Sequence, residues 1–177
     1  MSQRDSGYER KERDLYETPA WVTCELVKHL PQLPMPGIWE PACGSGKMVA
    51  ALNDCALGFV VTGTDIVDGK DFLKSQELPQ DCGAIITNPP YTDADLFIKH
   101  ALNLIHPRGV VAMLLRTDFD HAKGRMALFS GCPAFSKKLV LTRRIRWFED
   151  STGSPSFNHA WFIWDWQHKG QPTLAYA

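Results

Sequence analysis

The stretch Ile38-Trp39-Glu40-Pro41-Ala42-Cys43-Gly44-Ser45-Gly46-Lys47 decides the fold of this 177-residue chain. Its apolar start is typical of a short buried strand, and the proline and two glycines that follow predict a tight turn. Apolar residues at helical spacing then continue from 48 to 57. Strand, glycine turn and helix in this order indicate the first unit of an α/β sheet that binds a nucleotide.

The glycine turn does not match the two common phosphate-binding motifs. A P-loop needs a glycine where this chain has Pro41, and a serine or threonine where it has Met48. The dinucleotide fingerprint needs a third glycine, and that position is Val49. We therefore expect the turn to approach a ligand other than a pyrophosphate. Glu40, at the end of the strand, suits a cationic or amino group of that ligand.

The next predicted strand covers 59–65, and acidic residues lie at its end and just after it. Asp65 lies about 20 residues beyond the glycines, where an acidic side chain commonly holds a ribose diol. Asp71 could accept a hydrogen bond from an adenine amino group, with Phe72 against the ring. The alternative for Asp71 is that it simply caps a turn.

A second motif, Asn88-Pro89-Pro90-Tyr91, follows the apolar run 84–86. Two prolines cannot continue a strand ladder or start a helix at once, so Asn88 is left at the edge of the sheet where ligands bind. The Asn88 amide oxygen and the Pro89 carbonyl can both accept hydrogen bonds from an exocyclic NH2 group. The Tyr91 ring can stack on a planar heterocycle. Asn-Pro-Pro could be a plain turn, but the glycine motif upstream favours a site.

The remaining pattern predicts further helices and strands. Thr18 and Pro19 are a good N-cap and first residue for a helix that ends before Pro31. Besides capping, the Thr18 hydroxyl at this helix N-terminus could serve a ligand carboxylate. We expect helices over 93–105 and 118–130, and strands over 109–115, 139–141 and 160–164. Residues 1–13 are polar and predict a flexible arm.

Composition bounds the class of protein. A hydrophobic content of 44% and six tryptophans exclude a disordered chain. No apolar run reaches membrane-spanning length, and the polar first residues are not a signal peptide, so we expect a cytoplasmic protein. The five cysteines are odd in number and lack a C-x-x-C pair, which favours reduced thiols. The histidines are scattered, and we predict no metal.

Charge is near neutral overall but uneven along the chain. Residues 121–148 contain seven Lys or Arg and no Asp or Glu, although the net charge is −1. A stretch of one sign in a neutral protein can be an edge that faces a polyanion, and the alternative is a solvated rim. We favour the first interpretation, an edge that faces a polyanion. The candidate contacts are Arg116, Lys137, Lys138, Arg143, Arg144 and Arg146.

Taken together, the motifs resemble those of class I S-adenosylmethionine-dependent methyltransferases, specifically the amino-methyltransferases marked by Asn-Pro-Pro-Tyr. Residues 40–46 resemble the cofactor loop of DNA adenine-N6 methyltransferases, and Tyr16-Glu17-Thr18-Pro19 resembles their N-terminal cofactor element. The cofactor motifs precede the catalytic motif along the chain, which is the order found in the gamma group. The resemblance covers most of 14–166. It implies an α/β, three-layer Rossmann-like fold with a mostly parallel central sheet and an antiparallel last strand.

The resemblance also implies roles for individual residues in one catalytic domain over 14–177. S-adenosylmethionine would be the cofactor, and its ribose and adenine would lie at Asp65, Asp71 and Phe72. Its methionine end would be lined by Thr18, Glu40, Cys43, Gly44 and Gly46. The target amino group would bind Asn88 and the Pro89 carbonyl, within the catalytic motif Asn88, Pro89, Pro90 and Tyr91. A further aromatic ring stacks on the flipped base in the family, and Phe157 is the matching candidate, unless it is a core residue.

The expected substrate is adenine in DNA, with short or relaxed sequence specificity. Relatives with strict specificity carry a separate target-recognition domain, and only eleven residues follow Trp166. An RNA adenine-N6 methyltransferase would use the same site. A protein glutamine-N5 methyltransferase also uses Asn-Pro-Pro-Tyr, but the basic stretch disfavours it. A cofactor-binding fold without catalysis is disfavoured because the four catalytic residues are intact.

Overall fold

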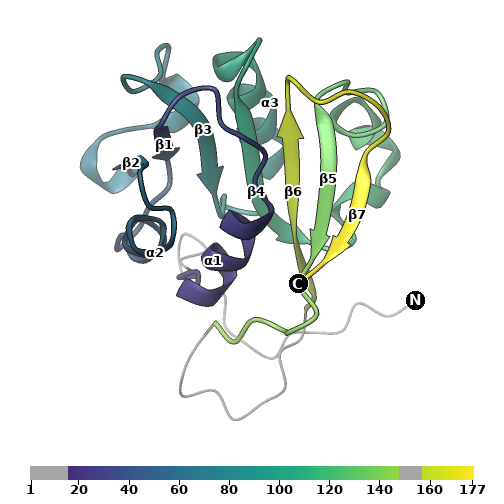
Figure 1. Ribbon diagram of the computed structural model, residues 1–177, viewed down its shortest axis with the longest axis horizontal. Coiled ribbons are helices and arrows are strands. Elements are labelled where there is room, and N and C mark those ends of the chain that lie inside the picture. Colours follow the sequence, from purple (N-terminus) through teal and green to yellow (C-terminus); the bar gives the residue numbers. More distant parts are fainter. Residues whose placement is uncertain (1–15, 148–156) are drawn as a thin grey trace.

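One seven-stranded sheet organises the part of the chain that the computed structural model describes, residues 16–147 and 157–177 (Figure 1). The strand order is β2-β1-β3-β4-β6-β5-β7. The strands are β1 (Gly37–Glu40), β2 (Val60–Gly63), β3 (Cys82–Thr87), β4 (Val110–Arg116), β5 (Phe135–Val140), β6 (His159–Asp165) and β7 (Thr173–Tyr176). The α-helices are α1 (Ala20–His29), α2 (Lys47–Cys55) and α3 (Ala94–Ile105).

Only β6 runs against the other described strands. It pairs antiparallel with β4 and with β5, and every other pairing is parallel. In Figure 1 its arrow points the opposite way to those of β3 and β5. The register sets Arg116, at the end of β4, opposite His159, at the start of β6. The carboxyl ends of the parallel strands and the amino end of β6 therefore share one edge, and the predicted fold class is confirmed.

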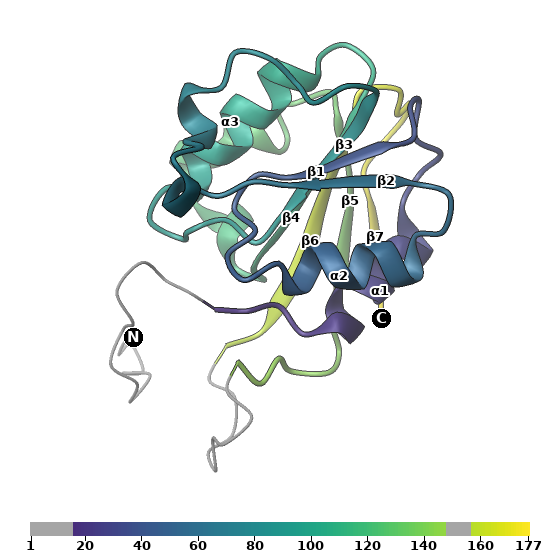
Figure 2. The ribbon, with the colours of Figure 1, turned by 90° about the vertical axis from the view of Figure 1, so that its left-hand side faces the viewer.

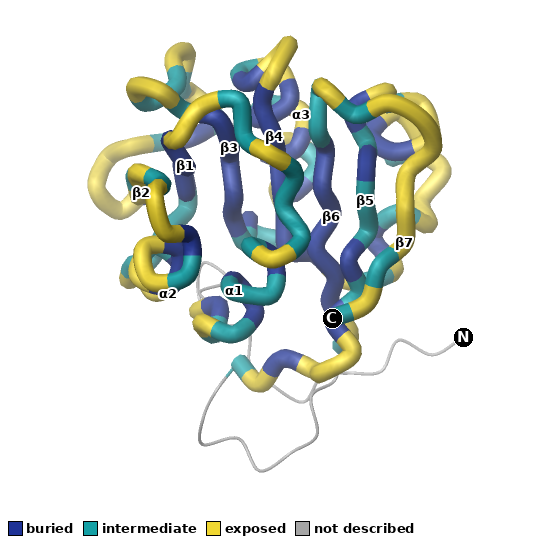
Figure 3. The backbone as a smooth tube through the Cα atoms, viewed as in Figure 1, coloured by how far each residue is buried: buried dark blue, intermediate teal, exposed yellow. Residues whose placement is uncertain are grey.

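Helices cover both faces of the sheet. Figure 2 shows α3 on one side and α1 with α2 on the other. Alternate residues of the central strands feed two separate cores, and the middle of the sheet is buried (Figure 3). Buried indoles also tie the layers together through hydrogen bonds. The Trp161 Nε1 group donates to the Val22 carbonyl of α1, and that of Trp164 donates to the Leu128 carbonyl on the opposite face.

Two local predictions were wrong. Thr18 is not the N-cap of α1, because the helix starts at Ala20 and Pro19 holds the cap position without a side-chain bond. Residues 118–130 do not form one helix but two short 3-10 helices, η4 (Phe119–His121) and η5 (Lys123–Leu128). Extended backbone at Ala122 separates them. Because burying Phe119 and Leu128 against the sheet outweighs local propensity, the chain breaks there.

Strand β7 was not predicted. It adds Thr173–Tyr176 to the outer edge of β5, in the parallel register that sets Lys138 opposite Leu174. It has only four residues, of which three are exposed, so it leaves little hydrophobic pattern to detect. All five cysteines are free thiols, and none of the helices in the described ranges is long and apolar enough to cross a membrane.

Candidate active site

A cavity of about 630 Å³ opens at the carboxyl ends of β1, β2 and β3. Its wall combines the segment before α1, the glycine turn, the loops after β2 and the Asn-Pro-Pro-Tyr corner. Of the predicted residues, those that line it are Thr18, Glu40, Cys43, Gly44, Asp65, Asp71, Phe72, Asn88 and Pro90. The structure thus brings the two sequence motifs to one cavity, where parallel α/β sheets bind ligands.

The glycine turn is shaped by left-handed backbone. Gly44 has a φ of 52° and Gly46 a φ of 84°, a region that residues with a Cβ rarely adopt. Asp65 fixes this turn from the end of β2. One of its carboxylate oxygens accepts from the Gly44 amide at 2.8 Å, and the other accepts from the Val67 amide at 3.0 Å. The carboxylate is buried against the backbone that surrounds the cavity.

Glu40 is a buried acid in the cavity wall. Its residue is 2% exposed, and its Oε2 atom has no hydrogen-bond partner among the described residues. Burial, and next the charge of Asp65, raises its pKa to about 8. Burial and the same two acids also raise the pKa of the Cys43 thiol, which therefore stays protonated. An unpartnered acid of this kind suits a cationic ligand group.

Asp71 and Phe72, the two residues that the sequence assigns to an adenine ring, both line the cavity. Asp71 accepts from the Leu73 amide at 3.1 Å, so it caps the 3-10 helix η3 (Phe72–Lys74) as well as lining the cavity. Its bond to Lys74 is the main cause of its lowered pKa. Phe72 packs between Trp39 and Phe97, with ring centroids 5.2 and 4.9 Å away.

The Asn88 side chain has one end engaged and one end without a partner. Its Nδ2 group donates to the Tyr16 carbonyl at 3.0 Å. Its Oδ1 atom is buried and accepts no hydrogen bond from residues 16–147 or 157–177. The Pro90 carbonyl accepts from the Asp93 amide, whereas the Pro89 carbonyl accepts no hydrogen bond from the same described residues. The Asn88 Oδ1 atom and the Pro89 carbonyl oxygen are both hydrogen-bond acceptors, and their role in binding an NH2 group stays a prediction.

Four aromatic rings gather beside Asn88, from four separate segments. Tyr91 stacks near Tyr16 and His159, at centroid distances of 6.4 and 6.2 Å. Trp147 is tilted on Tyr16 at 5.4 Å and meets His159 edge-on at 5.1 Å. Burial, and next the Arg116 charge, lowers the His159 pKa to about 4, so this ring is neutral at neutral pH. Sequence reasoning missed Trp147, which lines the cavity. The available signal was an aromatic residue just after the arginine run.

Several predicted residues lie outside the cavity wall. Gly46, Pro89 and Tyr91 belong to its two motifs but do not line it. Phe157 lies under the Arg116 guanidinium, at 4.2 Å from ring centroid to Cζ. Its role in stacking on a base stays a prediction.

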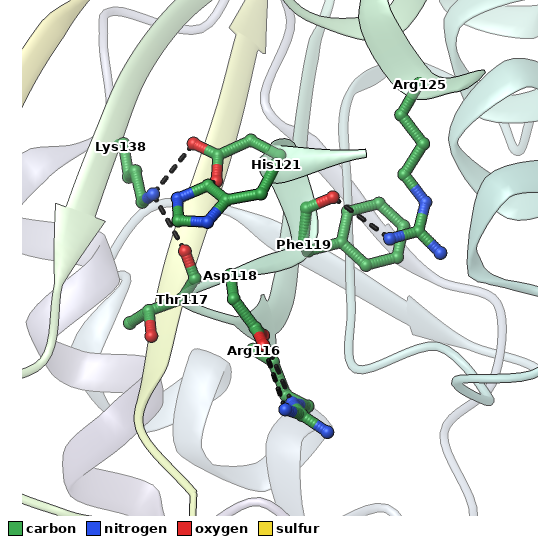
Figure 4. Close-up of polar contacts among 8 residues, drawn as sticks. Arg116, Thr117, Asp118, Phe119, His121, Arg125 and Lys138 are labelled. Carbon is green, nitrogen blue, oxygen red and sulfur yellow. Dashed lines mark hydrogen bonds and ion pairs between the residues drawn. The ribbon is translucent and has the colours of Figure 1, made fainter. Parts of the chain in front are cut away.

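The predicted basic residues form different kinds of contact, and Figure 4 shows those of Arg116 and Lys138. Arg116 makes a two-bond ion pair with Asp118. Lys138 donates to Asp120 and to the Thr117 carbonyl, so its charge is compensated. Lys137 donates to the His29 carbonyl of α1, and the Arg143 guanidinium lies 4.7 Å from the Trp21 ring centroid. Arg144 and Arg146 are exposed in the segment that leads to Trp147.

No protein-family model matches the sequence, and no curated protein does either. Solved structures do share the fold. One is a Listeria monocytogenes protein proposed to be a class I S-adenosylmethionine-dependent methyltransferase (TM-score 0.62, 14% identity, 89% of this chain and 63% of that one). Another is the type IIG restriction endonuclease BpuSI (TM-score 0.65, 12% identity, 88% and 26%). A third is the 23S rRNA methyltransferase ErmE (TM-score 0.54, 15% identity, 89% and 71%).

These likenesses show a Rossmann-like methyltransferase fold. The chain spans 63% of the Listeria protein and 26% of BpuSI. At these identities the fold is what is shared, so chemistry has to be argued from the cavity itself.

Proposed function

We propose that this protein transfers a methyl group from S-adenosylmethionine to the exocyclic N6 amino group of adenine in DNA. The observation that carries the proposal is the buried, unpartnered Oδ1 atom of Asn88 at a cavity that also holds the glycine turn. A buried acceptor without a partner costs free energy, and a ligand that donates to it removes that cost. A flat ring that carries an NH2 group fits both this acceptor and the neighbouring tyrosine, because the NH2 group can donate to Oδ1 and the ring can stack on Tyr91.

The cavity residues fit S-adenosylmethionine by their chemistry. Glu40 would hold the cationic amino group, and the Thr18 hydroxyl with the amides before α1 would hold the carboxylate. Asp65 would accept from the ribose hydroxyls, and Asp71 with Phe72 would hold the adenine. When bound, the cofactor supplies an electrophilic methyl group on a sulfonium. The left-handed backbone at Gly44 allows the turn to lie close to it.

The asparagine corner would activate the target nitrogen. The N6 lone pair of adenine is delocalised into the ring, which makes it a poor nucleophile. If Asn88 Oδ1 and the Pro89 carbonyl accept its two N–H bonds, a pyramidal nitrogen is favoured and its nucleophilicity rises. Transfer of the methyl group would break its bond to sulfur, form the N6–C bond and release one N–H proton to solvent, and its rate would depend mainly on positioning. No covalent intermediate is needed, which suits the protonated Cys43 thiol. Because Oδ1 is buried, the base must leave its stack and displace neighbouring side chains to reach it.

Cofactor affinity is expected to rise with pH because of Glu40. Its pKa of about 8 in the free protein means that binding a cation expels a proton below that pH. The association constant should therefore increase by up to about tenfold per pH unit as the pH rises toward 8. Calorimetry across this range, in buffers of different ionisation enthalpy, measures both the slope and the proton release. Glu40→Gln should flatten the profile, and a flat profile in the wild type would contradict this role.

Trp147 is expected to contribute to binding of the target base. Removing a stacking ring costs about 1–3 kcal/mol per base, so Trp147→Ala should raise KM for the nucleic acid roughly tenfold or more. Trp147→Phe should retain most of the affinity. Steady-state kinetics at saturating cofactor measures the change, with Phe157→Ala as the comparison. A larger effect at Phe157 would assign the stacking to that ring instead.

A nucleic-acid substrate is favoured over a protein amide by the exposed arginines Arg144 and Arg146, which precede Trp147. The Arg143–Trp21 and Arg116–Phe157 pairs place guanidinium groups over half-buried aromatic rings, and proteins hold nucleic-acid strands with arginine side chains and aromatic rings. RNA is the second candidate, since ErmE has the same fold and modifies 23S rRNA. A glutamine amide in a protein is a weaker one.

Methyl transfer from labelled cofactor to DNA and RNA oligonucleotides of one sequence, and to a glutamine-containing peptide, separates these substrates. We expect the highest initial rate on DNA. Faster transfer to RNA would shift the assignment to the second candidate. Transfer to the peptide alone would overturn it.

A further inference from the structure

The segment Tyr16-Glu17-Thr18, just before α1, contacts both motifs. At one end, the Tyr16 carbonyl accepts the hydrogen bond from Asn88 Nδ2 at 3.0 Å. In its middle, Glu17 reaches the glycine turn, where Ser45 Oγ donates to one carboxylate oxygen and Lys47 Nζ lies 2.6 Å from the other. Thr18 is buried in the cavity wall. One short segment therefore joins the cofactor turn to the catalytic asparagine.

The Tyr16 carbonyl determines which end of the Asn88 amide is left for a ligand. A carbonyl oxygen accepts only, so it selects the NH2 end of the side chain. The oxygen end is then the one left without a partner. If the Asn88 amide were rotated by about 180°, its own NH2 group would face the N–H donors of the incoming NH2 group. Both partners would then be unsatisfied, and binding of that group in the reactive geometry would be lost.

We propose that Glu17 is a positioning residue: by holding the 16–18 segment on Ser45 and Lys47, it keeps the Tyr16 carbonyl on Asn88 and the amide oxygen available to substrate. This inference rests on the proposed function of Asn88. Glu17 itself touches neither reacting atom in the proposal. Its effect on catalysis passes through the backbone of Tyr16.

The exposure of the ion pair makes this role separable from folding. The Lys47 and Glu17 side chains are 57% and 40% exposed, and exposed pairs contribute little to global stability. Loss of the pair should therefore leave the unfolding temperature nearly unchanged while it releases the segment. Glu25 offers a matched control, because it makes a similar exposed pair with Lys28 on α1.

The kinetic test compares Glu17→Ala, Lys47→Glu and the exchanged pair Glu17→Lys with Lys47→Glu. We expect Glu17→Ala to lower kcat roughly tenfold at saturating cofactor and DNA. This is the change in rate that corresponds to the free energy of one exposed ion pair and one hydrogen bond. The exchanged pair should recover most of this loss relative to Lys47→Glu alone, and Glu25→Ala should match the wild type. An unchanged kcat in Glu17→Ala, with or without weaker cofactor binding, would overturn the inference.

A second readout does not depend on methyl transfer. The side-chain amide signal of Asn88, identified by its loss in Asn88→Asp, should exchange with solvent slowly in the wild type. It should exchange roughly tenfold faster in Glu17→Ala. Unchanged exchange would overturn the positioning role. If the wild type methylates no substrate at all, the proposed function fails, and the amide exchange then decides the positioning by itself.

Discussion

Asn88→Ala is expected to lower the rate of methyl transfer by about 10²–10³-fold or more, the usual effect of removing a group that interacts with the reacting centre. The substitution deletes a buried side-chain oxygen at the corner that accepts no hydrogen bond from the described residues. It also removes the bond to Tyr16, so the segment before α1 loses a contact. The cavity side of the glycine turn is untouched, and cofactor affinity should stay within about threefold of the wild type.

Single-turnover rates with labelled cofactor, together with calorimetric cofactor binding, measure the two quantities separately. Asn103→Ala is the matched control, because Asn103 is exposed on α3 and should have no effect on either. A fully active Asn88→Ala variant would contradict the scheme. Loss of cofactor binding to the same extent as activity would show that Asn88 acts through the shape of the site instead.

Asp65→Ala is expected to weaken cofactor binding about a hundredfold, since hydrogen bonds to a charged group contribute about 1.5–3 kcal/mol each. Two effects add here. The ribose hydroxyls lose their acceptor, and the Gly44 amide loses the carboxylate that now holds it at 2.8 Å. The glycine turn should therefore become looser as well as less complementary to the ligand.

Calorimetry gives the affinity for this variant, and thermal unfolding gives the cost of the lost turn contacts. Asp68→Ala is the control, because Asp68 ends the 3-10 helix η2 (Ile66–Asp68) that Asp65 caps, but is exposed and does not line the cavity. If Asp65→Ala bound the cofactor as tightly as the control, the assignment of the ribose to this residue would be wrong.

The sequence predicts the two motifs of the cavity because each is local. A strand, a glycine turn and a helix are encoded within ten or so residues, and the Asn-Pro-Pro corner is stiff by covalent geometry. That both lie at one edge follows from parallel strands, whose carboxyl ends share a side. The ring of Trp147 and the carbonyl of Tyr16 could not be placed in this way. Their positions depend on contacts between segments far apart in the chain.

The charge pattern shows the same limit of local reasoning. Residues 121–148 contain no acid, yet Lys138 pairs with Asp120, just before this run, and Arg125 pairs with Asp95 of α3 at 2.8 Å. Lys137 is directed to α1 because neighbouring residues of a strand point to opposite faces. The basic run is therefore divided between ion pairs, packing against helices and the exposed arginines near the cavity.

The most direct test of the proposed chemistry is identification of the methylated atom. DNA incubated with the protein and isotope-labelled S-adenosylmethionine would be digested to nucleosides and analysed by mass spectrometry against standards. We predict that the label appears in N6-methyladenine. Label on a cytosine or on no nucleoside, in a preparation that binds the cofactor, would contradict the account.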